Sequence, residues 1–164
     1  MIPQSIHWHR TAPPPPECAR VDSDLTADVV IIGAGLTGLR TAITLAEAGV
    51  DTAVLDAEKI GFGSSGRSGG QCNPIWRATP NDLCRKFGAA QAERLIQTTL
   101  TSADDLFDDI RRYDVDCEAE QNGWIQAAHT SNAADGLKEL QAAWAGVGAD
   151  ITINSRVETR AAVG

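Results

Sequence analysis

The sequence has little positive charge. Its 14 lysine and arginine residues are outnumbered by 22 aspartate and glutamate residues, which gives a formal net charge of −8 at pH 7. Nucleic-acid binding requires a basic surface that neutralises phosphates, and anionic membranes attract polybasic segments. The acidic balance therefore argues against a nucleic-acid partner and against a polybasic membrane patch.

The chain also lacks a long apolar run. No stretch of the sequence reaches the roughly 18 consecutive apolar residues that can cross a bilayer. Residues 1–10 lack the apolar core of a secretory signal peptide. The sequence therefore predicts no membrane span and a cytoplasmic location.

Cysteine and histidine are scarce. The four cysteines form no CxxC pair, and the three histidines do not accompany them at metal-ligand spacing. We therefore expect no metal site, and we expect reduced thiols with structural or incidental roles. Cys72 differs from the other three because it lies beside a glycine-rich segment.

The sequence does contain enough apolar residues to form a globular core. Hydrophobic residues make up 43% of the 164 positions, which fits one domain or an incomplete two-domain protein. Residues 1–27 form a polar, proline-rich arm, in which Pro13–Pro16 favour an extended surface segment. A PxxP ligand is one interpretation, but a spacer is favoured, and Trp8 could anchor it.

The clearest local pattern runs from Asp28 to Asp56. Residues 28–32 form a β-branched run that predicts a parallel strand buried on both faces. A helix is expected from Leu36 to Ala48, with Gly49 ending it, and a second strand at residues 52–56. Its expected apolar face is formed by Leu36, Leu39, Ile43 and Ala46. The predicted fold class is α/β with a Rossmann-like βαβ unit.

A GxGxxG motif connects the first strand to the helix. Gly33 permits the tight turn, Gly35 lets the backbone approach a pyrophosphate, and Gly38 allows close packing of helix and strand. Asp56 lies at the end of the second strand, where an acid accepts hydrogen bonds from an adenosine ribose. Because an acid there disfavours a 2′-phosphate, the motif predicts NAD or FAD rather than NADP.

The segment after the second strand helps to choose between these two cofactors. Residues 61–71 are rich in glycine and serine, and Ser64, Ser65 and Arg67 could donate hydrogen bonds to a diphosphate. Such a loop suits an extended ligand such as FAD, although a mobile surface loop is the alternative interpretation. The βαβ pattern alone leaves NAD and FAD open.

Helical patterns dominate after Pro80. A long helix is expected at residues 89–113, with an apolar face formed by Ile96, Leu100, Ala103, Phe107 and Ile110. Residues 124–128 and 151–153 are expected to be strands. A helix from Asn132 to Ala145, with Ser131 as its N-cap, should lie between them. Residues 81–164 are thus predicted to begin a mixed α/β substrate domain.

The glycine-rich segments resemble a known family. The run DVVIIGAG at residues 28–35 and the run IGFGSSGRSGGQ at residues 60–71 are similar to those of the D-amino-acid-oxidase-like FAD-dependent oxidoreductases. Within that family they look most like the gamma-glutamylputrescine oxidase subfamily, whose loop reads close to GFGASGRNGGQ. This chain departs from that pattern at Ser64 and Ser68. The likeness continues more weakly through residues 110–117 and 123–125.

The resemblance implies the cofactor FAD and a set of contacts with it. The implied positions are Gly33, Gly35, Leu36, Thr37 and Gly38 at the pyrophosphate; Asp56 and Ala57 at the ribose; Ser64, Ser65 and Arg67 along the diphosphate and ribityl chain; and Gly69, Gly70 and Gln71 near the isoalloxazine ring. The implied reaction is oxidation of a C–N bond by hydride transfer to the flavin. The partners would be a small-molecule amine or amino acid and O₂ or another electron acceptor.

The expected organisation has three parts: an arm at residues 1–27, an FAD-binding segment at residues 28–80, and the start of a substrate region at residues 81–164. Because family members continue well beyond this length, we expect the N-terminal portion of an oxidoreductase and assign no catalytic residue. Tyr113, Trp124 and His129 fit core positions better. An NAD-binding dehydrogenase fragment and a non-catalytic truncated remnant are the alternatives.

Overall fold

The structure is a computed structural model, and it describes residues 6–163. The chain divides into two compact units, one ending at Gln71 and the other beginning at Cys72. This division comes earlier than the expected boundary at Pro80. The reason is that Ile75 and Ala78 pack against the hydrophobic core of the second unit.

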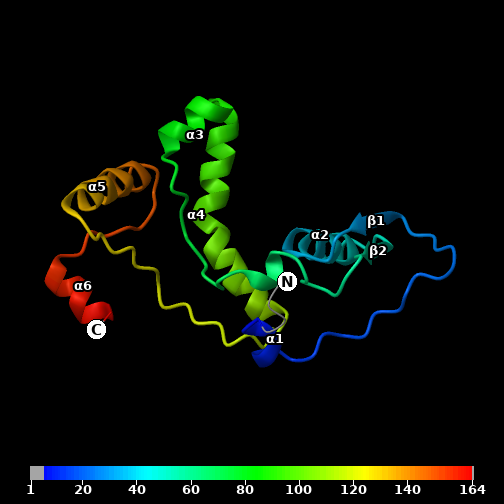
Figure 1. The fold of residues 1–164 in the computed structure, drawn as a ribbon. Helices are drawn as coiled ribbons and strands as arrows, with labels where there is room; N and C mark the ends of the chain where they lie inside the picture. Colours follow the sequence, from blue (N-terminus) through cyan, green and yellow to red (C-terminus); the bar gives the residue numbers. More distant parts are fainter. Residues whose placement is uncertain (1–5, 164) are drawn as a thin grey trace. The chain divides into compact units, whose positions relative to one another are not determined.

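The first unit contains the expected βαβ arrangement (Figure 1). Strand β1 (Val29–Ile32) leads into helix α2 (Leu36–Glu47), which is followed by strand β2 (Thr52–Leu55). The strands are parallel, with Val29 opposite Thr52 and Ile32 opposite Leu55. The prediction of a Rossmann-like βαβ unit is therefore confirmed at the level of local topology.

Two details of this unit differ from expectation. β1 is not buried on both faces, because Val30 and Ile32 are exposed while their neighbours along the strand are half-buried. The face of α2 is also different: the half-buried side chains include Leu39, Ala42 and Leu45, whereas Leu36, Ile43 and Ala46 are exposed. The side of α2 that carries Gly38 approaches β1. Leu36, Ile43 and Ala46 therefore face away from the strand.

The arm before β1 is mostly irregular. A short helix, α1 (Trp8–Thr11), precedes Pro13–Pro16, which are exposed and outside regular secondary structure. This agrees with the extended surface segment expected from the proline run.

Helices α3 (Pro80–Phe87) and α4 (Ala89–Arg112) form the first part of the second unit. α3 begins with a capping box, in which the hydroxyl of Thr79 and the carboxylate of Asp82 each accept a hydrogen bond from the other residue's backbone N–H. Gly88, with φ of +77°, separates the two helices. The predicted long helix is confirmed, and its five expected apolar positions are buried or half-buried.

The core of the second unit forms where α3, α4 and α5 (Ser131–Ala145) meet. Leu83, Ala92, Ile96 and Trp144 are buried, and the indole N–H of Trp144 donates to the carbonyl of Ala78 at 3.2 Å. The N-cap of α5 is Thr130 rather than the expected Ser131, because the Thr130 hydroxyl accepts from the N–H of Ala133 at 3.1 Å.

The strands expected at residues 124–128 and 151–153 are wrong. Within residues 6–163 the sheet consists of β1 and β2. Residues 124–128 and residues 151–153 lack regular secondary structure. A strand exists only when a neighbour accepts and donates its backbone hydrogen bonds. The described part of the second unit is thus helical where it is regular, and its last helix is α6 (Arg156–Val163).

None of the helices between residues 6 and 163 is long and apolar enough to cross a membrane.

Candidate functional site

The glycine-rich turn is held between the end of β1 and the start of α2. The N–H of Gly33 donates to the carbonyl of Leu55 at 2.7 Å, and Gly33 has φ of +109°, a conformation that glycine adopts without strain. A Cβ on Gly38 would lie 1.9 Å from the carbonyl oxygen of Gly33 and 3.3 Å from Cγ2 of Ile31. Glycine at position 38 is therefore what lets the helix approach the strand.

Asp56, which directly follows β2, is hydrogen-bonded to the glycine-rich turn that follows β1. One carboxylate oxygen accepts from the N–H of Ala34 at 2.7 Å, and the other accepts from the N–H of Glu58 at 2.8 Å. These two backbone donors, Ala34 first, hold the pKa of Asp56 below its ordinary value. The side chain is exposed, and each carboxylate oxygen keeps a further lone pair. The expected ribose contact remains a prediction, but a brace for the glycine-rich turn is an additional role.

The second glycine-rich segment folds back on the first. The N–H of Gly61 donates to the carbonyl of Ala34 at 3.0 Å, and the N–H of Leu36 donates to the hydroxyl of Ser65 at 3.1 Å. A short 3₁₀ helix, Ser65–Arg67, carries that hydroxyl. Two motifs that are far apart in the sequence thus meet at the N-terminus of α2.

This junction has the features that an anion-binding site requires. Glycine at position 35 leaves room for the second segment, since a Cβ there would lie 2.8 Å from the Ser65 hydroxyl. The first turn of α2 contains no acidic residue that would neutralise the positive end of the helix dipole. Backbone N–H groups in the first turn of a helix lack intrahelical acceptors. The residues present therefore fit a diphosphate at this position.

The remaining predicted site residues lie around this junction. Ser64, Arg67, Gly69, Gly70 and Gln71 are exposed, as are Leu36, Thr37 and Ala57. The guanidinium of Arg67 lies over the ring of Phe62, with its carbon 4.7 Å from the ring centroid. Their contacts with a cofactor remain predictions.

Two contacts of the site were not assigned from the sequence. Ala34, which is 3% exposed, supplies the N–H that binds Asp56, and the motif spacing assigns this residue no role. Trp8 reaches the second glycine-rich segment, where its indole N–H donates to the carbonyl of Ser68 at 2.8 Å. The sequence suggested that Trp8 anchors the arm but did not identify its partner.

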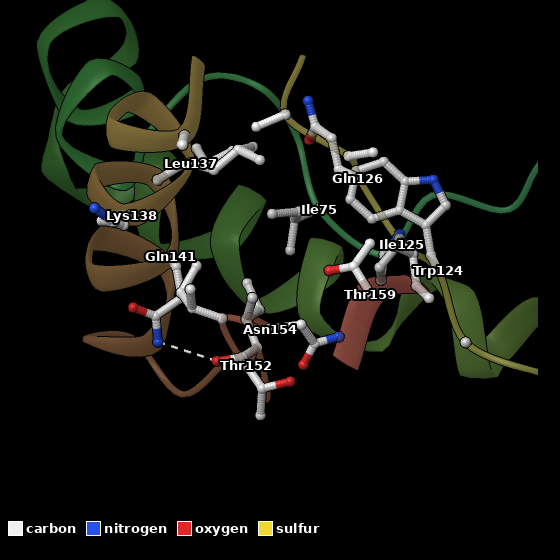
Figure 2. Close-up of a pocket in the computed structure, with 18 of the residues that line it drawn as sticks. Ile75, Trp124, Ile125, Gln126, Leu137, Lys138, Gln141, Thr152, Asn154 and Thr159 are labelled. Carbon is white, nitrogen blue, oxygen red and sulfur yellow. Dashed lines mark hydrogen bonds between the residues drawn. The ribbon is translucent and has the colours of Figure 1, made fainter. Parts of the chain in front are cut away.

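The second unit contains a separate cavity of about 1120 Å³ (Figure 2). Its walls come mainly from residues 122–129, from α5 and from residues 150–154, and Trp124 and Ile125 contribute apolar side chains. Gln141 and Ile151 both line the cavity, and the side-chain amide of Gln141 donates to the carbonyl of Ile151 at 3.0 Å. Trp124 and His129 were expected in the core, but both are exposed and line this cavity. Tyr113 is half-buried and is not among the lining residues. Within residues 6–163, no group of three potential ligands is arranged to hold a metal ion.

Comparison with known proteins agrees with the geometry of the first unit. The family model for FAD dependent oxidoreductases, abbreviated DAO, matches residues 28–163. The chain is 34% identical over 124 residues to the gamma-glutamylputrescine oxidoreductase of Escherichia coli strain K12, an alignment that covers 76% of this chain and 29% of that protein.

Two further relatives carry the name "Probable oxidoreductase OrdL". The one from Haemophilus influenzae is 34% identical over 70% of this chain and 26% of its own length. The one from Rhizobium meliloti strain 1021 is 35% identical over 68% of this chain and 24% of its own length. The chain thus spans less than a third of the length of these curated relatives. No solved structure gives a significant match.

Proposed function

The chain belongs to the DAO family of FAD-dependent oxidoreductases, and from this premise we propose that its first unit holds the ADP half of FAD in an enzyme that oxidises a C–N bond of an amine or amino acid. The observation that carries the proposal is the junction at the N-terminus of α2. There the N–H of Leu36 meets the hydroxyl of Ser65, and the Gly61 N–H joins the two glycine-rich segments.

Each part of the junction has a separate task in this proposal. The first-turn N–H groups of α2 other than that of Leu36 bind the diphosphate. Gly35 leaves room for Ser65 beside them, and Gly38 lets the helix approach β1. Asp56 holds the turn through Ala34 while its free lone pairs accept from ribose hydroxyls. Ser64, Ser65 and Arg67 supply donors along the ligand, and Gly69–Gln71 lie beside its ring. The expected contacts of Leu36, Thr37 and Ala57 belong to the same assignment.

FAD, when bound, supplies the isoalloxazine ring that accepts a hydride from the carbon next to the substrate nitrogen. The role of this chain is to orient that ring, to bind the anionic half of the cofactor and to exclude water around it. One relative is named a gamma-glutamylputrescine oxidoreductase, which supports an amine or amino-acid substrate. The proposal adds O₂ or another electron acceptor as the second partner. We assign residues 28–80 to cofactor binding and residues 81–164 to the beginning of the substrate side. A cytoplasmic location completes the proposal.

A titration with FAD tests the cofactor assignment. The 164-residue chain is titrated with FAD and, separately, with NAD, while flavin fluorescence or thermal stability is followed. We expect saturable binding of FAD and weak or no binding of NAD. Binding of NAD with no response to FAD would favour the dehydrogenase alternative instead.

A pair of glycine variants localises the binding to the junction. Gly35→Ala places a Cβ 2.8 Å from the Ser65 hydroxyl and inside the space proposed for the diphosphate, so FAD affinity should fall at least about tenfold. Gly63→Ala is the matched control, because a Cβ there meets no atom within 4 Å. Equal loss in both variants would contradict the assignment of the diphosphate to this junction.

The substrate class needs its own measurement. Under anaerobic conditions, a series of amines, amino acids and hydroxy acids is added to the FAD-loaded chain, and the oxidised-flavin absorbance is followed. Bleaching by amines or amino acids alone supports C–N oxidation. Stable FAD binding without bleaching by any donor would favour the non-catalytic alternative.

A further inference from the structure

We propose that Trp8, in the arm before the βαβ unit, is a positioning residue that clamps residues 68–70 in the conformation that faces the flavin. The inference rests on the proposed function, because it takes Gly69–Gln71 as the part of the chain nearest the isoalloxazine ring. It adds a residue that lies outside the matched family region, which begins at residue 28.

The clamp has two contacts with the glycine-rich segment. The indole N–H of Trp8 donates to the carbonyl of Ser68 at 2.8 Å, although the two residues are 60 positions apart. The same indole covers Gly70, where a Cβ would lie 2.9 Å from Cζ2 and 3.2 Å from Cη2 of the ring. Gly70 has φ of +72°, so the ring packs against a backbone conformation that glycine adopts readily.

The indole is itself held in place. Trp8 begins α1, and its carbonyl accepts from the N–H of Ala12 at 2.9 Å. The ring of His7 meets the indole edge-on, with centroids 4.9 Å apart and planes at 78°. The tryptophan therefore presents its N–H and one ring face from a turn of helix rather than from a free arm.

The segment that Trp8 contacts needs such support. Ser68, Gly69, Gly70 and Gln71 are exposed and belong to no helix or strand, and glycine has many accessible conformations. If FAD binds only when this segment is correctly placed, its apparent affinity falls with the fraction of time the segment is displaced. Trp8 raises the fraction of time for which residues 68–70 are correctly placed before FAD binds, and this is preorganisation.

The clamp can be measured without any cofactor. Trypsin cleaves after Arg67, so the cleaved bond joins Arg67 to the residue whose carbonyl Trp8 binds. Cleavage requires local opening of the chain, and its rate is proportional to the population of the open form when the chain recloses faster than it is cleaved. Cleavage after Arg67 is followed by mass spectrometry in wild type, Trp8→Phe and Trp8→Ala, with cleavage after Lys138 in the second unit as internal reference.

Trp8→Phe keeps an aromatic ring but lacks the N–H. Its cleavage after Arg67 should be about fivefold faster than in wild type, the loss expected for one net hydrogen bond. Trp8→Ala removes both contacts and should be faster still, by tenfold or more. Trp124→Phe is the matched control because Trp124 is 38% exposed and Trp8 is 39% exposed, and it should leave this rate unchanged.

The same variants are then titrated with FAD by flavin fluorescence. Trp8→Phe should bind FAD about fivefold more weakly than wild type, and Trp8→Ala should bind at least tenfold more weakly, with a flavin spectrum closer to that of free FAD. Equal cleavage rates in all variants would overturn the clamp. Faster cleavage with unchanged FAD affinity and spectrum would overturn its role toward the flavin. A wild-type chain that binds no FAD would contradict the proposed function, while the cleavage rates would still judge the clamp separately.

Discussion

Replacing Gly38 with alanine should destabilise the first unit, even though alanine is the better helix former. Gly38 lies in the first turn of α2, and its missing side chain faces β1. A Cβ at this position would lie 1.9 Å from the carbonyl oxygen of Gly33, 3.1 Å from its carbonyl carbon and 3.3 Å from Cγ2 of Ile31. Two of these three atoms belong to the backbone, so no side-chain rotation can relieve the overlap.

The size of the effect follows from two opposing contributions. Alanine improves on glycine inside a helix by about 1 kcal/mol. Against this, the helix must retreat by more than 1 Å to bring the Cβ to the 3.0 Å at which real contacts begin. Overpacking of this kind costs about 1–3 kcal/mol or more, and the retreat also weakens dispersion contacts between helix and strands. Because the closest overlap is with backbone, the cost should lie near the upper end of this range, about 3 kcal/mol. We therefore expect a net loss of about 2 kcal/mol, or a fall in Tm of roughly 8–16 °C for a unit of this size.

Hydrogen–deuterium exchange gives the sharpest assay, because it reports β1, α2 and β2 separately from the second unit. Gly136→Ala in α5 is the matched control, since a Cβ there meets nothing within 4 Å. That variant should be more stable than wild type by up to about 1 kcal/mol, and the change should be confined to the second unit. Unchanged or slower exchange of the βαβ unit in Gly38→Ala would refute the reasoning.

Two further predictions concern side chains that bind backbone N–H groups. The pKa of Asp56 is lowered by the N–H groups of Ala34 and Glu58, so the stabilising effect of its carboxylate is present above the ordinary value of 3.8 and is lost as the pH falls through the lowered pKa. Asp56→Asn should therefore make the loss of first-unit stability at acid pH shallower. Thermal melts between about pH 2 and about pH 6 can check this, and an unchanged slope would contradict it. Thr79→Ala removes the hydroxyl that caps α3 and should lower the free energy of unfolding of the second unit by about 1 kcal/mol, as measured in urea. Thr79→Ser keeps a hydroxyl and should retain most of the wild-type stability. If the serine variant were as unstable as the alanine variant, the capping box with Asp82 would be contradicted.

The elements that could be predicted from sequence are those that depend on neighbouring residues. The steps of three and four along α4 identified its buried face, and the β-branched run before Gly33 identified β1. Gly49, with φ of +77°, follows α2 where a helix end was expected. Each of these patterns reports a local preference that the fold retains.

The predictions that were wrong depend on contacts between distant residues. Residues 124–128 and 151–153 have strand-like composition, but composition does not supply a partner strand, and both are irregular. The face of α2 was misjudged because hydrophobicity favoured Leu36 and Ile43, whereas the close approach at Gly38 decided how the helix lies.

The candidate site shows the same division. The sequence identified both glycine-rich segments and Asp56, since their motif spacing carries chemical meaning. It did not predict that the Ser65 hydroxyl would meet the Leu36 N–H, or that Asp56 would bind the N–H of Ala34. These contacts depend on how the second segment folds back, and that geometry has no signature in residue spacing.

The proline run gives the arm a physical property of its own. The contact between Trp8 and Ser68 closes a large ring of chain, and Pro13–Pro16 are part of that ring. Proline restricts the conformations open to a chain, so a stiff spacer loses less entropy on ring closure than a glycine-rich one. The arm therefore acts as a tether that sets the effective concentration of the indole at its acceptor. A stiffer arm should therefore keep the ring closed for a larger fraction of time at the same strength of contact.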